Sequence, residues 1–165
     1  SELFAGFKSD VQNFLKAVGP FEKGEKYNAD LLEKYFRRIQ TNLIAYNINE
    51  HDYYIGPELV DNEIRNGQFT LPDGYNIVPH LFLFKVVQGN EYVPAPDPDF
   101  KLRRPSNHNS YSLFIEKITA QMLSYRAMYE LDYNKTDRAK TYIQKIITDF
   151  PDYNLPVQLR NTLNY

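Results

Sequence analysis

Cysteine and tryptophan are both absent from the 165 residues of this chain. Without a thiol, the sequence excludes disulfides, thiolate metal sites and cysteine nucleophiles. A long apolar run is also missing: the richest stretch, Ile77 to Val87, is interrupted by Pro79, His80 and Lys85, whereas crossing a bilayer takes roughly 20 apolar residues. Neither charge sign dominates, because 19 basic residues stand against 21 acidic ones and the net charge is -2. A nucleic-acid role, which normally needs a basic surface, is therefore not expected.

The start of the chain, Ser1-Glu2-Leu3-Phe4, has neither an initiator methionine nor the basic and apolar stretches of a signal peptide. We expect a processed chain or a part of a longer protein. The length predicts a single domain over residues 1–165 with one core. Aromatic residues are abundant, at 15% with 14 tyrosines and 11 phenylalanines, so rings must supply much of that core.

The first region, residues 1–50, has the apolar spacing of two helices. Apolar residues recur every three or four positions from Phe4 to Val18, and Gly19-Pro20 predicts the end of that helix. Asn28 is placed to cap a second helix that runs to about Asn47.

The second region, 51–109, is predicted to hold short strands and loops. A strand is expected over 52–56, then a short helix from Glu58 to about Asn66 and a turn over 71–74. Residues 75–87 look extended, and their densest part, 81–87, is typical of a strand covered on both faces. A hairpin at Gly89-Asn90 should lead into residues 91–93, and the prolines at 94, 96, 98 and 105 predict a stiff surface loop.

The third region, 110–165, has the pattern of a helical hairpin. One apolar face runs from Tyr111 to Tyr129, residues 134–136 form a turn, and a second face runs from Ala139 to Phe150 before Pro151. The spacing of small and aromatic residues is similar to one tetratricopeptide repeat, although no second copy follows. The predicted fold class is therefore helix-rich α+β, with a small sheet flanked by helices and a C-terminal tetratricopeptide-like hairpin.

Four short motifs occur in an order that points to a family. They are Asn42-Leu43-Ile44-Ala45-Tyr46, His51-Asp52-Tyr53-Tyr54-Ile55, the stretch from Gly67 to Val87, and Asp149-Phe150-Pro151. This order resembles the soluble C-terminal region of bacterial polytopic membrane proteins related to protein O-mannosyltransferases, seen especially in Bacteroidetes, over roughly residues 35 to 155. The resemblance implies that any catalytic residues lie in a membrane part outside this chain.

Tyrosines and one histidine are the candidate ligand-binding residues. Tyr53, Tyr54, Tyr75 and Tyr92 could form an aromatic platform at a sheet edge, because ring faces stack on sugars and peptide side chains. His108 lies in a polar loop just before a helix, whereas the spacing of the three histidines is not that of a metal site.

Two functions remain open at this stage. The first is a non-catalytic accessory or interaction domain of a larger bacterial envelope protein, on the periplasmic or extracytoplasmic side, that binds a protein or glycan partner and needs no cofactor and no metal. The second is a sugar-directed enzyme that uses Asp97, Asp99 and His108, since Asp97-Pro98-Asp99 matches the Asp-x-Asp pair with which many sugar transferases hold a metal.

Overall fold

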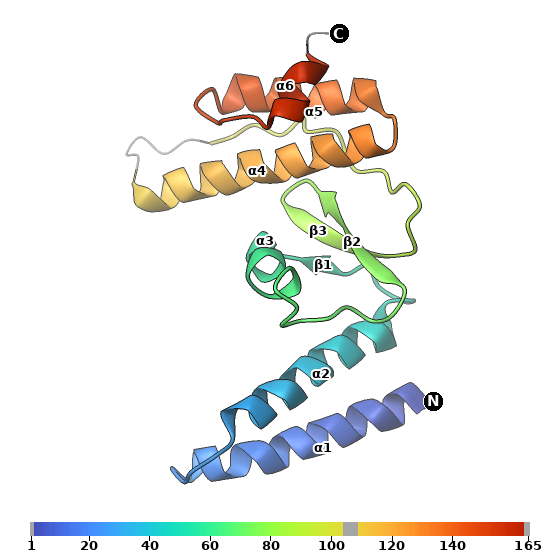
Figure 1. Cartoon of the computed structure of the whole chain (residues 1–165), viewed down its shortest axis with the longest axis vertical. Coiled ribbons are helices and arrows are strands. Elements are labelled where there is room, and N and C mark those ends of the chain that lie inside the picture. The colour runs from blue at the N-terminus through green and yellow to red at the C-terminus, as the bar shows by residue number, and fades with distance from the viewer. Residues whose placement is uncertain (1, 104–108, 164–165) are drawn as a thin grey trace. The chain divides into compact units, whose positions relative to one another are not determined.

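A computed structural model describes residues 2–103 and 109–163 of the chain, and the side chains from residue 5 onward within these ranges (Figure 1). The fold is helix-rich α+β with a small three-stranded antiparallel sheet, which confirms the predicted class. Contacts divide the chain into two compact units, residues 1–53 with 58–75 and residues 54–57 with 76–165. The expectation of a single domain stays a prediction, because a division of contacts does not say whether the units fold independently.

Helix α1 (Glu2–Glu22) continues through Gly19 and Pro20, so the prediction that these residues stop it is wrong. The helix ends where Gly24 adopts a φ of 70°, a conformation that suits glycine. The Glu25 N–H donates to the Pro20 carbonyl at 2.8 Å and the Gly24 N–H donates to the Phe21 carbonyl at 3.0 Å. This pair of bonds is a Schellman motif, which satisfies the last carbonyls of the helix.

Helix α2 (Ala29–Asn47) begins at the predicted cap, where the Asn28 side chain accepts a hydrogen bond from the Leu31 N–H at 3.0 Å. It packs against α1. The buried carboxylate of Asp10 on α1 accepts a hydrogen bond from Asn42 at 2.7 Å and pairs with Arg38 at 3.1 Å, so polar contacts fix how the two helices align.

A predicted short helix follows α2, but its geometry changes along its length. It starts as α3 (Pro57–Leu59) and continues as the π-helical turn η1 (Val60–Ile64), and Gly67 follows with a φ of 70°. Arg37 on α2 forms an ion pair with Glu63, and the Thr41 hydroxyl donates to the Thr70 carbonyl at 2.9 Å. These contacts hold residues 60–70 along one side of α2.

The sheet has the order β1-β3-β2 and comprises β1 (Tyr54–Ile55), β2 (Tyr75–His80) and β3 (Leu83–Gln88). The turn between β2 and β3 occupies residues 81–82, with Leu81 at a φ of 56°, so the predicted hairpin at Gly89-Asn90 is wrong. The predicted burial of 81–87 on both faces is also wrong. The apolar run folds back on itself at residues 81–82. Along β3, successive side chains point to opposite faces of the sheet, so Phe84 and Val86 are buried, whereas Leu83 is exposed.

The C-terminal region contains the predicted helical pair, α4 (Ser110–Asp132) and α5 (Thr136–Asp149), and a short unpredicted helix α6 (Val157–Thr162). Asn134 makes the predicted turn with a φ of 58°. The core of this unit joins all three helices and contains Ala120, Leu123, Ala127, Tyr142, Ile143, Ile146, Phe150, Leu155 and Leu159. The similarity of the α4–α5 pair to a tetratricopeptide repeat stays a prediction. Within the described residues, no helix has the length and apolar character that crossing a membrane requires.

Candidate functional site

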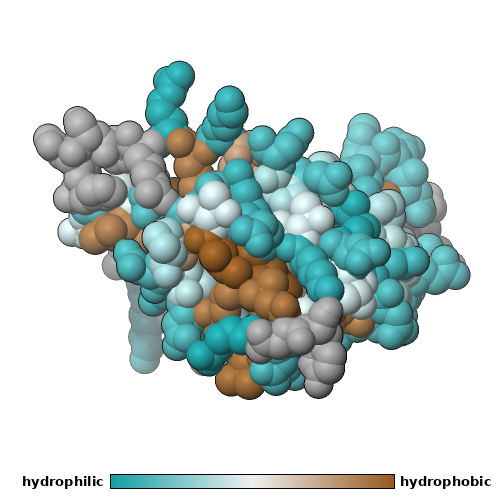
Figure 2. Space-filling view, turned by 90° about the horizontal axis from the view of Figure 1, so that it is seen from above, coloured by the Kyte–Doolittle hydropathy of each residue, from teal (hydrophilic) through white to brown (hydrophobic). Residues whose placement is uncertain are grey.

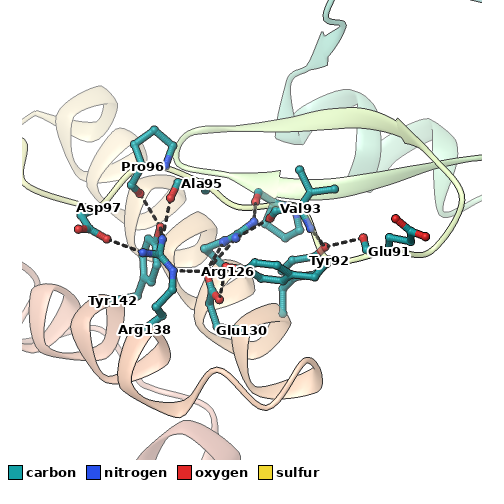
Figure 3. A network of polar contacts seen from close by, with 12 residues as sticks. Glu91, Tyr92, Val93, Ala95, Pro96, Asp97, Arg126, Glu130, Arg138 and Tyr142 are labelled. Atoms are coloured by element: carbon teal, nitrogen blue, oxygen red, sulfur yellow. Dashed lines mark hydrogen bonds and ion pairs between the residues drawn. The ribbon is translucent and has the colours of Figure 1, made fainter.

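A fully buried ion pair lies at the centre of the C-terminal unit (Figure 3). Arg126 and Glu130 stand one turn apart on α4, with the Arg126 Nη2 and Glu130 Oε1 atoms 2.8 Å apart. The Arg126 guanidinium also donates to the main-chain carbonyls of Pro79, at 2.9 Å, and Val93, at 2.8 Å. One side chain of α4 therefore joins strand β2 to the extended segment that follows the sheet.

That extended segment, residues 90–100, is held by side chains rather than by strand pairing. Arg138 donates to the Ala95 carbonyl at 2.6 Å, Tyr142 donates to the Pro96 carbonyl at 2.5 Å, and Lys145 donates to the Phe100 carbonyl at 2.5 Å. Figure 3 shows the carbonyls of Ala95 and Pro96 turned toward Arg138 and Tyr142 of α5. The predicted surface loop is thus partly buried: Ala95 and Pro98 are covered.

Glu130 is the carboxylate with which both arginines of this network, Arg126 and Arg138, form ion pairs. Besides Arg126, its carboxylate accepts hydrogen bonds from Arg138 Nε at 3.2 Å and from the Tyr92 hydroxyl at 3.0 Å. Burial works against the charged form of Arg138, but the hydrogen bond and charge of Glu130 outweigh it and raise the pKa of the guanidinium. Burial also raises the pKa of the Tyr142 hydroxyl, which therefore stays protonated at neutral pH and can donate. The network is an anchor for the segment.

The predicted tyrosine platform is spread over both units. Tyr53 and Tyr75 belong to the first unit, and Tyr54 and Tyr92 to the second. The Tyr54 ring packs edge-on against His80 at 5.4 Å, whereas the Tyr92 ring lies 6.0 Å from Tyr129 within the buried network. A ligand role for these tyrosines stays a prediction, and His108 lies outside the described residues.

Asp97 and Asp99 line a shallow groove of about 520 Å³ with residues of α5. The Asp97 carboxylate is 2.9 Å from Arg138 Nη1, so a cation already accompanies it. Across residues 2–103 and 109–163, no cluster of three or more histidine and acidic side chains is placed to hold a metal ion.

A larger cleft, of about 710 Å³, opens between the first half of α4 and the segment that joins α5 to α6. Its volume lies within the range of ligand-binding pockets. Apolar side chains supply much of its wall, and one lysine, two carboxylates and one amide complete it. The lining residues are Leu113, Glu116, Lys117, Ala120, Phe150, Pro151, Asp152, Tyr153 and Asn154.

The first turns of α4, which contribute Leu113 to this cleft, expose an unusual amount of apolar surface. Asn109 caps the helix and forms reciprocal hydrogen bonds with Ser112, so the first turn is well defined. Yet Tyr111 is 71% exposed, Leu113 55% and Phe114 46%. Of the apolar face predicted from Tyr111 to Tyr129, the first residues are therefore exposed and only Met122 is fully buried. Figure 2 shows hydrophobic side chains gathered on the face of the C-terminal helices that is seen from above.

The lining residues that the structure describes include no serine, histidine or cysteine, and their ionisable groups are those of Glu116, Lys117, Asp152 and Tyr153. The Tyr153 hydroxyl is hydrogen-bonded to Ser124, and burial raises its pKa, which keeps it neutral. The sequence did not point to these residues, because they come from α4 and from the segment after α5, at least 30 positions apart.

Comparison with known proteins identified no relative of this chain. No protein-family model matches the chain, and no match to it was found among curated proteins or solved structures.

Proposed function

We propose that this chain is a non-catalytic interaction domain that binds a protein partner in the cleft between α4 and the α5–α6 segment. The observation that carries the proposal is the position of this cleft next to the exposed apolar start of α4. Exposed apolar residues that gather beside a concave site are typical of interaction surfaces rather than of an ordinary solvated face.

The character of the wall favours a peptide with an apolar side chain. Leu113, Pro151 and the ring of Tyr153 can contact an aliphatic or aromatic side chain, and Glu116 and Asp152 can attract a basic neighbour of it. Sugar sites usually need an exposed ring face with several hydrogen-bonding groups around it. Here the Tyr153 hydroxyl is already engaged by Ser124, which makes a glycan the second choice of ligand.

The wider context of the domain is also a proposal, and it rests on the sequence resemblance alone. We place the chain in a larger bacterial envelope protein related to protein O-mannosyltransferases, on the extracytoplasmic side of the membrane. In that setting the domain would bring a partner to a membrane-embedded part. Fractionation of the full-length product, with protease access tested from the outer side, would check this placement.

The binding role can be tested by selecting peptides from a displayed random library against the whole chain. Titration calorimetry would then compare the selected peptides on the unchanged chain and on a Leu113→Glu variant, which puts a charge at the mouth of the cleft. The matched control is Leu83→Glu, because Leu83 is also an exposed leucine but lies on β3.

We expect Leu113→Glu to weaken binding at least tenfold and Leu83→Glu to leave it unchanged. Equal affinity for both variants would contradict the cleft as the binding site. A library of oligosaccharides serves as the second arm: binding of a sugar that Leu113→Glu abolishes would make the ligand a glycan. Turnover of such a sugar would refute the non-catalytic role.

A further inference from the structure

Helices α1 and α2 pack together, yet they bury very little of themselves. They comprise 21 and 19 residues, and among their described side chains only Asp10 and Ile44 are buried. A helical pair in a folded protein normally covers one apolar stripe per helix. We propose that the α1–α2 pair is a self-association surface, through which two copies of this chain join as a four-helix bundle.

Helix α2 already makes contacts within the chain on two of its faces. One side faces α1 through the contact of Asn42 with Asp10. Another side carries Arg37 and Thr41, whose bonds to Glu63 and Thr70 hold the following segment.

The third side of α2 has an apolar stripe. Leu32, Phe36 and Leu43 are spaced by four and seven residues, which places them on one face of the helix. The Phe36 ring lies 6.0 Å from the ring of Phe14 on α1, so the stripe runs beside the seam between the two helices. Phe36 and Leu43 are nevertheless 44% and 45% exposed. This is the face that a partner would cover.

The exposed apolar area is about what a dimer needs. The pair exposes six large apolar side chains by between 39% and 60%, namely Leu15, Phe21, Leu31, Phe36, Leu43 and Tyr46. With roughly 150–250 Å² for a whole aromatic side chain, they offer on the order of 500 Å². A standard interface buries about 800 Å² per partner, of which somewhat over half is apolar, so a dimer needs the stripe on α2 together with exposed apolar residues of α1 and of the helix ends.

The net charge of the α1–α2 pair favours a second copy of this chain, rather than a membrane or a nucleic acid, as the partner that covers this face. Helix α1 carries three acidic and two basic residues, and α2 carries two acidic and three basic residues, so the pair has no net charge. An anionic lipid surface or a nucleic acid would call for an excess of lysine and arginine. In a two-fold dimer that sets α1 of one copy against α2 of the other, the small negative and positive excesses face each other. Two antiparallel pairs joined in this way make a four-helix bundle.

Sedimentation velocity of the whole chain over a range of concentrations tests this inference. We expect a monomer–dimer equilibrium in the micromolar range, and a monomer throughout for Leu43→Glu. The control is again Leu83→Glu, with the same substitution at a leucine that is 41% exposed, and it should dimerise like the unchanged chain. Circular dichroism of each variant checks that the helices are retained.

The lack of cysteine allows a second measurement that does not depend on a destabilising charge. Mixing a Phe36→Cys chain with a Leu15→Cys chain, which carry the thiol on α2 and on α1, should give a disulfide-linked dimer under mild oxidation, whereas mixing Leu83→Cys with Leu15→Cys should not. A chain that stays monomeric at all concentrations overturns the inference, and so does a dimer that Leu43→Glu leaves intact. Binding of the monomer to vesicles of anionic phospholipid would equally overturn it and assign the face to a membrane surface. Peptide binding in the cleft is independent of all these outcomes.

Discussion

Replacing Glu130 by glutamine is the most informative single change, because it removes one charge and keeps the shape of the side chain. Glu130 accepts hydrogen bonds from Arg126, Arg138 and the Tyr92 hydroxyl. A glutamine in the same rotamer can still accept from Arg126 through its carbonyl oxygen. What disappears is the negative charge that compensates a fully buried guanidinium.

The expected loss of stability follows from the burial of the pair. Breaking a buried ion pair by removing one partner costs about 3–5 kcal/mol, because the remaining charge is left without compensation. Arg138 is one-third exposed, so solvent screens it and its own share is small. For a chain of this size, each kcal/mol lowers Tm by roughly 2–4 °C, so Glu130→Gln should lower Tm by about 6–20 °C.

Thermal unfolding followed by circular dichroism measures this loss, and amide hydrogen exchange locates it. The Val93 N–H donates to the Tyr129 hydroxyl at 2.8 Å, so its exchange should accelerate strongly once the segment loosens. The matched control is Asp132→Asn, which removes the same charge from an exposed position of α4 and should change stability by less than about 0.5 kcal/mol. If Glu130→Gln melts within about 2 °C of the unchanged chain, the buried pair does not hold the segment in place.

Three further predictions concern other parts of the chain. Burial raises the pKa of Tyr142 above its value of 10.0 in the unfolded chain, so stability should be intact below pH 10 and fall as the pH rises further; urea midpoints should show this fall, and it should be smaller in Tyr142→Phe. Asn28→Ala removes the cap of α2 and should cost about 0.5–2 kcal/mol in urea unfolding, whereas Asn28→Ser should cost little; equal losses would argue against the cap. Mn²⁺ should not raise Tm through Asp97 and Asp99; a Tm increase that an Asp97→Asn, Asp99→Asn double variant abolishes would instead favour the sugar-directed enzyme.

Features set by local sequence were predictable. The cap at Asn28, the helical conformation of the long helices and the turn at Asn134 all depend on neighbours within a few positions, and each is observed. Pro20 was misread as a helix end because a missing N–H near the last turn costs only one hydrogen bond, while Gly24 four positions later completes a motif that ends the helix well.

Features set by distant contacts were not predictable. Arg126 meets carbonyls 33 and 47 positions away, and nothing in the spacing of residues around it indicates such partners. The hairpin turn at Leu81 has no glycine, asparagine or aspartate to mark it, so the apolar run read as one strand. The apolar spacing assigns the two segments of the cleft to separate helix faces, and only their packing brings Leu113 and Phe150 together.

The way in which residues 93–100 are anchored bears on how this protein can vary over evolution. Their carbonyl oxygens are the same whatever side chain stands beside them, so exposed positions such as Pro94 and Asp99 can drift in sequence without loosening the segment. The donors have no such freedom, because Arg126, Arg138 and Tyr142 each reach a carbonyl with one particular side chain. Among natural variants, substitutions should therefore be frequent in residues 93–100. Relatives that keep this segment in place should retain Arg126, Arg138 and Tyr142.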